Sequence, residues 1–382
     1  MKMPHGEGEG MSNLIVASAQ QQMRLFDSPE DYRKEMNRFL HMARAKGAQL
    51  VVFPELSGVM ASTPMVEGFR VRLLKQARNQ TSLWARARGA LAGGTASLLR
   101  ANFRKAFESY LHTDPQALTA TYETIFRELA QSYEVTIVAG SAYLADAGAL
   151  RHRAMVFGPD GTALGFHDKV VLGEDDQGLA EPGRDWTAVD TPVGRLGVLF
   201  GAEIVHPEAG RLLGGQGAEL MVALGAVTGE VGAARVREAA IARAQENRCY
   251  VLTSFMVGPR YLSSSDPQLS ALVGKSGIYG PLELTPHHSG VLVEMGTGSS
   301  EGLLTAELNL EQLHSLWDTP DRPWRADELS GLFSGPMAAL YAGGAAVEPV
   351  AAGDKLDITE PVAAGAVSEE TTASADAAII DL

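Results

Sequence analysis

Short apolar runs alternate with amphipathic segments along most of the chain. The run LIVASAQ at 14–20 predicts a strand, and residues 31–46 carry apolar side chains at helical spacing before Gly47. QLVVFPE at 49–55 predicts a second strand, which ends in a proline and a carboxylate. Because the strands are mainly apolar, this β-α-β unit predicts an α/β fold whose parallel sheet is buried on both faces.

The same alternation continues toward the C-terminus. A hairpin is predicted at 153–162, where Pro159-Asp160-Gly161 supplies the residues of a tight turn. Helices are predicted at 116–133, at 230–247 and from Pro207 onward, and strands at 135–140, 195–201, 219–226, 250–256, 290–295 and 302–308. These elements place one folded domain at 12–325, followed by a C-terminal extension at 326–344.

Three segments depart from this pattern. Residues 1–11 and 345–382 are polar and low in complexity, and we expect them to be disordered. The segment 63–115 holds nine lysines and arginines but only three acids, and predicts a basic helical insertion. Apolar residues among its arginines suit a contact with a protein partner or a lid over a pocket first, and a membrane surface second.

Composition narrows the classes of function. The formal net charge of −14 argues against a nucleic-acid partner, because phosphates repel an acidic protein. The single cysteine, Cys249, excludes an intramolecular disulfide, and we expect it to be a buried structural residue. No segment resembles a secretory signal or a membrane span, which favours a cytoplasmic protein. The histidines show no metal-ligand spacing, so we expect neither a metal nor another cofactor.

Residues with possible chemistry follow three of the predicted strands. Glu55 ends the strand at 49–54, Lys169 follows the hairpin, and Gly201 follows the strand at 195–200. Ligands of open α/β sheets gather at the carboxyl ends of strands. The sequence therefore predicts a pocket that contains these three residues.

The motifs around these residues resemble the nitrilase (carbon–nitrogen hydrolase) family. VVFPEL (51–56) is similar to its general-base motif, with Glu55 at the catalytic glutamate, and HDKVVL (167–172) is similar to its lysine motif, with Lys169 at the catalytic lysine. GRLGVLFGAEIVHPE (194–208) resembles the nucleophile motif without a gap, and Gly201 stands at the cysteine position. Further similarities lie at 242–254, at 274–281 and at Asp321-Arg322, so that the resemblance covers 14–60 and 116–325.

The resemblance implies a four-layer α-β-β-α sandwich that pairs into a homodimer or a higher oligomer. In the family, a thiolate attacks an amide or nitrile carbon, the glutamate takes the thiol proton, and the lysine and a backbone N–H stabilise the oxyanion. Ala202 would supply that N–H, and Glu203 takes the acidic position beside it. Counting back from Pro182-Gly183 places Asp176 at a second acidic position. The resemblance makes Asp176, Ala202 and Glu203 candidate substrate-binding residues.

Glycine has no side chain, so we expect the thiol chemistry to be absent. The first hypothesis is a family protein that binds a small amide, amine or carboxylate between Glu55 and Lys169. The second is an active hydrolase that uses water activated by Glu55, and the third is a dimeric scaffold that acts through the basic segment 63–115. Detectable turnover separates the first two, and a pocket plugged by its own polar side chains favours the third.

Overall fold

The computed structural model describes residues 13–66, 103–263, 271–318 and 327–342. The chain divides into a unit ending at Pro320 and a second unit, Asp321–Leu382, whose described part is the helix α11 (Asp327–Tyr341). The predictions for the termini 1–11 and 345–382, for the middle of the basic segment and for Asp321-Arg322 fall outside the described residues.

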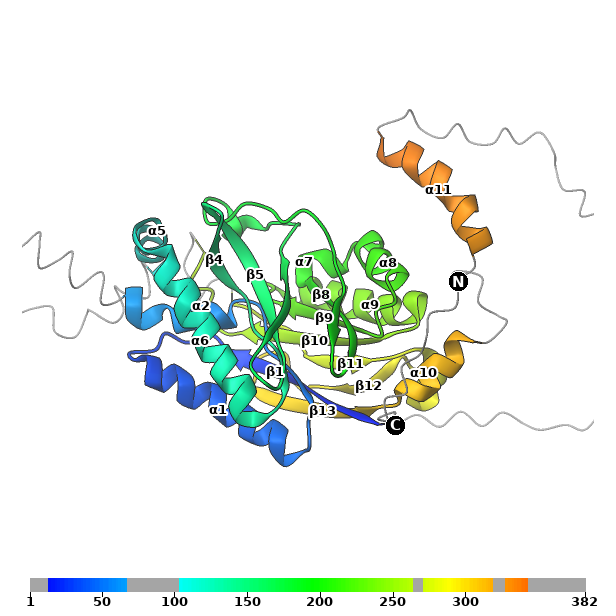
Figure 1. Cartoon of the computed structure of the whole chain (residues 1–382), viewed down its shortest axis with the longest axis horizontal. Coiled ribbons are helices and arrows are strands. Elements are labelled where there is room, and N and C mark those ends of the chain that lie inside the picture. The colour runs from blue at the N-terminus through cyan, green and yellow to red at the C-terminus, as the bar shows by residue number, and fades with distance from the viewer. Residues whose placement is uncertain (1–12, 67–102, 264–270, 319–326, 343–382) are drawn as a thin grey trace, which may run out of the picture. The chain divides into compact units, whose positions relative to one another are not determined.

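Six parallel strands form the centre of the first unit (Figure 1). In spatial order they are β3 (Thr136–Val138), β2 (Leu50–Val52), β1 (Leu14–Gln22), β10 (Tyr250–Val257), β9 (Leu220–Gly225) and β8 (Gly194–Phe200). β1 and β10 pair only through Gln21–Met256 and Gln22–Val257 at their C-terminal ends. This short seam divides the sheet into two halves.

Antiparallel strands complete both halves. β4 (Ala142–Asp146), β5 (Ala149–Phe157) and β6 (Ala163–Asp168) extend the first half beyond β3, and β13 (Gly302–Leu308) pairs with β1. β7 (Val189–Thr191) borders β8, β11 (Gly277–Tyr279) borders β10, and β12 (Val291–Glu294) borders β11. The predicted hairpin turn joins β5 to β6, with Gly161 at φ +82° and the Gly158 N–H donating to the Thr162 carbonyl.

The helices begin where the sequence supplies a cap. Ser28 accepts a hydrogen bond from the Asp31 N–H at 3.1 Å to start α1 (Pro29–Ala45), and Asp114 accepts one from Ala117 to start α6 (Pro115–Tyr133). The others are α2 (Ser57–Ala61), α5 (Phe103–Thr113), α7 (Gly201–Ile204), α8 (Pro207–Gly215), α9 (Glu230–Asn247) and α10 (Leu310–Trp317). In the part of the chain that is described, no helix is both long and apolar enough to cross a bilayer.

Alternation along the strands produces four layers. In β2, Leu50 and Val52 join the core between the two halves of the sheet, whereas Val51 joins the core under α1, α2, α5 and α6. In β9, Leu220 faces that same central core and Met221 faces the core under α8 and α9. Three cores between four layers make the predicted α-β-β-α sandwich.

Both described ends of the predicted basic insertion pack on the sandwich. Val66 is buried, and so are Phe103, Phe107 and Leu111 of α5, all in the core that also contains the buried faces of α1 and α6. The apolar positions of α5 recur at helical spacing and cover the sheet, so this helix belongs to the sandwich. That 63–115 is an insertion stays a prediction, and its residues 67–102 lie outside the described residues.

Gly140, which follows β3, holds the loop of Glu55 in place. A Cβ at this position would lie 2.2 Å from the Cβ of Ser57 and 2.4 Å from the carbonyl oxygen of Pro54. Because the backbone of this loop must shift to relieve the clash, we expect Gly140→Ala to lower the free energy of unfolding by about 2–3 kcal/mol in urea denaturation. Gly215→Ala is the control, since nothing lies within 4 Å of its added Cβ. Equal midpoints for the two variants would contradict this packing.

Candidate functional site

A cavity of about 280 Å³ opens at the carboxyl ends of the central strands. Glu55 comes after β2, Lys169 directly after β6, Gly201 directly after β8 and Ala226 directly after β9. The walls also include Leu56, Tyr143, His152, Gly173, Glu174, Asp175, Asp176, Ala202, Val205, Val227, Gly232, Arg235, Val236 and Arg260. The fold thus brings together all the residues that were predicted for the site except Glu203.

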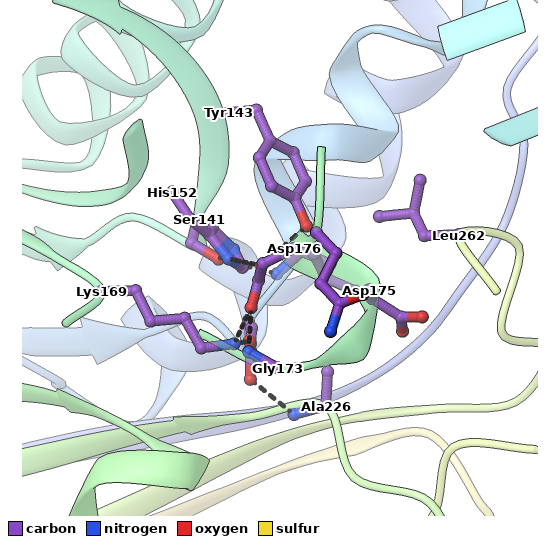
Figure 2. A network of polar contacts seen from close by, with 12 residues as sticks. Ser141, Tyr143, His152, Lys169, Gly173, Asp175, Asp176, Ala226 and Leu262 are labelled. Carbon is purple, nitrogen blue, oxygen red and sulfur yellow. Dashed lines mark hydrogen bonds and ion pairs between the residues drawn. The ribbon is translucent and has the colours of Figure 1, made fainter. Parts of the chain in front are cut away.

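Lys169 connects two carboxylates at the inner end of the cavity. Its ammonium group donates to Glu55 Oε1 at 2.7 Å and forms an ion pair with Asp176 Oδ2 at 2.8 Å (Figure 2). All three side chains are buried, and Glu55 Oε2 also accepts from the Ala226 N–H at 3.0 Å. Neither oxygen of Glu55 is without a donor, so the carboxylate is held in one orientation.

Asp176 is the centre of this network. Besides Lys169, it accepts from the Gly173 N–H at 2.7 Å, from the Tyr143 hydroxyl at 2.9 Å and from His152 Nδ1 at 2.6 Å. Tyr143 and His152 are directly opposite each other on β4 and β5, which places both side chains on one face of the sheet. The sequence motifs did not reveal these two residues, because only the strand register unites them.

The hydrogen bonds of His152 define its tautomer. A carboxylate only accepts, so Nδ1 carries the proton that is donated to Asp176. His152 Nε2 lies 2.7 Å from Ser141 Oγ, which accepts from the Leu56 N–H at 2.9 Å. If the serine hydroxyl donates to Nε2, a neutral imidazole satisfies every group in this chain. Leu56, a non-glycine residue at φ +66°, is thereby fixed beside Glu55.

The two carboxylates differ in basicity. Burial raises the pKa of Glu55, and the positive charge of Lys169 offsets this only in part. Burial acts in the same direction on Asp176, but His152 and Lys169 outweigh it and hold the pKa of Asp176 well below its usual range. Burial acts to lower the pKa of Lys169, yet the charges of Glu55 and Asp176 raise it. Lys169 is therefore an ammonium ion, and Glu55 is the carboxylate of the pair that takes up a proton first.

The low pKa of Asp176 makes stability depend on acid pH. A carboxyl whose pKa is lower in the folded state stabilises the fold above its unfolded pKa, and this contribution is lost as the pH falls toward the folded pKa. Asp176→Asn should cost about 3 kcal/mol near pH 7, because an amide NH₂ would face the donors Gly173 and Lys169. The gap between wild type and variant should narrow toward about pH 3 in urea denaturation. A gap that is constant with pH would contradict this assignment.

Gly201 leaves room for a side chain. It is the first residue of α7, and its backbone does not require glycine, since it is not among the residues with positive φ. An added Cβ would lie 3.4 Å from the Gly225 Cα, 3.6 Å from the Leu224 carbonyl oxygen and 3.7 Å from Val236 Cγ2. These are ordinary van der Waals contacts, so a larger residue fits here without displacing the backbone.

Glu203 has a different place from the one predicted. It is fully buried and accepts from the N–H groups of Phe200 at 2.9 Å and Val170 at 2.6 Å, and its Oε2 lies 2.8 Å from His167 Nε2. It lies outside the set of residues that line the cavity. Through Phe200 and Val170, Glu203 joins the end of β8 beside Gly201 to the loop that follows Lys169.

Cys249 is buried, as predicted, but lies far from the cavity. It immediately precedes β10, whose eight residues run toward the carboxyl edge of the sheet. At about 3.3 Å per residue, roughly 26 Å of strand separate the two edges. The thiol of Cys249 therefore cannot reach a ligand that lies beside Glu55.

Two arginines line the outer part of the cavity. Arg260 pairs with Asp175 at 2.6 Å and with Glu174 at 3.5 Å. Arg235, on the second turn of α9, is exposed and has no ion-pair partner within 13–66, 103–263, 271–318 and 327–342. It offers the cavity a cation that no carboxylate of the described protein neutralises.

Comparison with known proteins places these features in one family. The sequence pattern of the family described as carbon–nitrogen hydrolase matches residues 15–316. The omega-amidase NIT2-A of Xenopus laevis is 29% identical over 199 residues, which cover 50% of this chain and 67% of that protein. The probable hydrolase YhcX of Bacillus subtilis is 26% identical over 196 residues, which cover 51% of this chain but only 37% of that protein.

Solved structures share the fold. A carbon–nitrogen hydrolase from Helicobacter pylori has a TM-score of 0.58 at 19% identity and covers 81% of this chain and 96% of its own. An amidase from Nesterenkonia sp. AN1, with acrylamide added to its active-site cysteine, has a TM-score of 0.55 at 18% identity. The match covers 80% of this chain and 99% of that amidase. A variant of that amidase in complex with butyramide has a TM-score of 0.55 at 18% identity. The match covers 79% of this chain and 93% of the variant.

Proposed function

The chain belongs to the carbon–nitrogen hydrolase family, and from this premise we propose that it binds a small polar ligand without hydrolysing it through a thiol. The observation that carries this proposal is Gly201, which stands in the cavity beside Glu55 and Lys169 at the position of the nucleophile motif. A covalent acyl intermediate needs a nucleophilic side chain, and glycine offers none. The thiol of Cys249 lies at the other edge of the sheet.

The lining of the cavity favours a ligand with an amide group. The NH₂ of an amide donates, as the carboxylate of Glu55 requires, and its carbonyl accepts, as the ammonium of Lys169 requires. The N–H of Ala202 belongs to the first turn of α7, where backbone donors have no partner within a helix. Butyramide in the variant amidase from Nesterenkonia supports this ligand class, and the small cavity limits the ligand to a few heavy atoms.

Arg235 adds a second feature to the ligand. A carboxylate at the far end of the ligand would pair with this guanidinium, for which the described residues supply no acid. The proposed ligand is therefore a small amide, and a carboxylate group on the end remote from Glu55 strengthens its binding.

Calorimetric titration of the full chain with butyramide, butyrate, butylamine and succinamate tests this function. We expect butyramide and succinamate to bind, succinamate more tightly, and Glu55→Gln to weaken both by about tenfold through loss of one charged hydrogen bond. Arg235→Ala should weaken succinamate alone, which makes butyramide the internal control. Absence of heat with all four ligands would contradict the proposal.

A second function, hydrolysis by water that Glu55 activates, has one observation in its favour. Burial raises the pKa of Glu55, which makes this carboxylate a better base. We rank it second because the water would have to attack an unactivated amide directly, without the covalent intermediate that divides the reaction into two easier steps. Ammonia release from butyramide that disappears in Glu55→Gln would establish this alternative in place of the first.

Homodimerisation and a cytoplasmic location stay proposals that follow from the family resemblance and the composition. A scaffold role through the basic segment is the third hypothesis. It is less favoured because the cavity keeps about 280 Å³ beside its polar network and is therefore not plugged.

A further inference from the structure

We propose that Arg104 of α5 is a positioning residue that holds Asp176 against Lys169. The inference deepens the proposed function, since Asp176 and Lys169 form the inner wall of the binding cavity. Arg104 lies on a helix within the segment 63–115, which we predicted to be an insertion.

Arg104 joins α5 to two other segments through three backbone carbonyls. Its Nη1 donates to the carbonyl of Asp175 at 2.9 Å and to that of Leu262 at 2.6 Å, and its Nη2 donates to that of Gln177 at 2.7 Å. Its Nε donates to Glu108 one turn further along α5 at 3.0 Å. The planar guanidinium is suited to this geometry, because its donors diverge from one rigid fork. The side chain is only 16% exposed, and its bonds to Asp175 and Leu262 are partly buried, whereas the bond to Gln177 is exposed.

The segment that Arg104 holds has little structure of its own. Asp176 ends a single turn of 3₁₀ helix, Glu174–Asp176, whose backbone bonds measure 3.2 Å from Asp176 to Gly173 and 3.3 Å from Gln177 to Glu174. So short a turn does not fix its own position. Arg104 binds the carbonyls on either side of Asp176, and Arg260 binds the carboxylate of Asp175 at 2.6 Å. Figure 2 shows Asp175 and Leu262 beside the network that ends at Lys169 and Ala226.

A second contact runs from α5 to the same carboxylate. Phe107, one turn after Arg104, packs edge-on against Tyr143 with ring centroids 5.8 Å apart. The hydroxyl of Tyr143 donates to Asp176 Oδ1 at 2.9 Å, and both rings are fully buried. α5 therefore contacts the neighbours of Asp176 in two ways. Arg104 binds the backbone on either side of Asp176, and Phe107 packs against Tyr143, which donates to its carboxylate.

Displacement of α5 would thus withdraw Asp176 from Lys169. Lys169 would keep only Glu55 as its carboxylate partner, and the pKa of the ammonium group would fall. The ligand would then meet a wall with a different charge. Any partner that shifts α5 would change the affinity of the cavity in this way, without touching the ligand.

The reactivity of the Lys169 amine tests the inference without any ligand. The full chain is acylated with an N-hydroxysuccinimide ester over a range of pH, and modification of Lys169 is measured by mass spectrometry. In Arg104→Met the pH profile should move to lower pH by about one unit when one carboxylate is lost, so that the rate at a fixed pH below the midpoint rises by about tenfold. Glu108→Gln is the matched control, since it leaves the three carbonyl contacts of Arg104 in place, and it should match wild type.

A merely structural role for Arg104 would lower the unfolding temperature but leave the pH midpoint of Lys169 where it is in wild type, and this outcome would overturn the proposal. If Arg104→Met does not fold, Arg104→Lys takes its place, because it keeps the charge but cannot span three carbonyls. An unchanged midpoint in Arg104→Lys would equally overturn it. Because no ligand is present, a negative result leaves the proposed function standing, and failure of every ligand to bind leaves this result standing.

Discussion

Lys169→Met should lower the free energy of unfolding by about 3–5 kcal/mol near neutral pH, the usual cost of leaving a buried charge without its partner. Lys169, Glu55 and Asp176 are all buried, and the ammonium lies 2.7 Å and 2.8 Å from the two carboxylates. Methionine keeps an unbranched side chain that ends at the ε-carbon and lacks only the ammonium nitrogen, so packing changes little. What is lost is the one cation that allows two carboxylates to lie side by side in a cavity wall.

The pH dependence separates this effect from a loss of packing. Without Lys169, the folded-state pKa of Glu55 should rise further above its unfolded value, and such a group destabilises the fold at pH values above its folded pKa. The penalty of Lys169→Met should therefore shrink as the pH is lowered and Glu55 takes up a proton. Lys34→Met is the matched control, because Lys34 pairs with Asp31 while 77% exposed, and it should have no measurable effect. A penalty that does not change with pH would count against the ion pair.

Gly201→Cys should convert an unreactive cavity into one that forms a covalent adduct with acrylamide. The added Cβ meets only ordinary contacts, the nearest at 3.4 Å, so the variant should fold like wild type. Its thiol would stand in an open cavity beside the ammonium of Lys169, a setting that favours the thiolate. We expect complete modification at position 201 by intact mass, under conditions in which wild type gains no mass.

The matched control for this experiment is the double variant Gly201→Cys with Cys249→Ser. Because Cys249 is fully buried at the other edge of the sheet, removing it should not change the extent of modification. Modification of Cys249 in wild type, or failure of the thiol at position 201 to react in a folded variant, would contradict the placement of Gly201 in the cavity.

The sequence was sufficient to predict the fold class and part of the site. The mainly apolar runs at 14–20, 49–55 and 219–226 predicted buried parallel strands, and they form central strands of the sandwich. Glu55 could be predicted because it ends an apolar strand, and Lys169 because it follows the predicted hairpin. The direction of the chain then fixes the edge of the sheet at which the ends of these strands meet. β4 and β7 were missed, because strands of five and three residues leave little periodicity to read.

The site residues that were missed or misplaced have one physical cause in common. The direction of a side chain depends on tertiary contacts, which the sequence pattern does not specify. His152 and Tyr143 reach Asp176 only because β4 and β5 pair in one register. Glu203 follows the motif position closely, yet one turn of helix directs it away from the cavity. The apolar residues of α5 predicted a helix but not the surface that it covers, so Arg104 was assigned to an insertion and its contacts with the 3₁₀ turn could not be foreseen.

The most direct test of the account is amide turnover by the protein as it stands. Butyramide is incubated with wild type and with Cys249→Ser, ammonia release is measured against a protein-free control, and the intact mass of each protein is recorded during the reaction. If the protein does not hydrolyse amides through a thiol, ammonia should appear at the uncatalysed rate with both proteins, and neither protein should carry an acyl adduct. An adduct on wild type together with amide turnover, both lost in Cys249→Ser, would contradict it and make Cys249 the nucleophile.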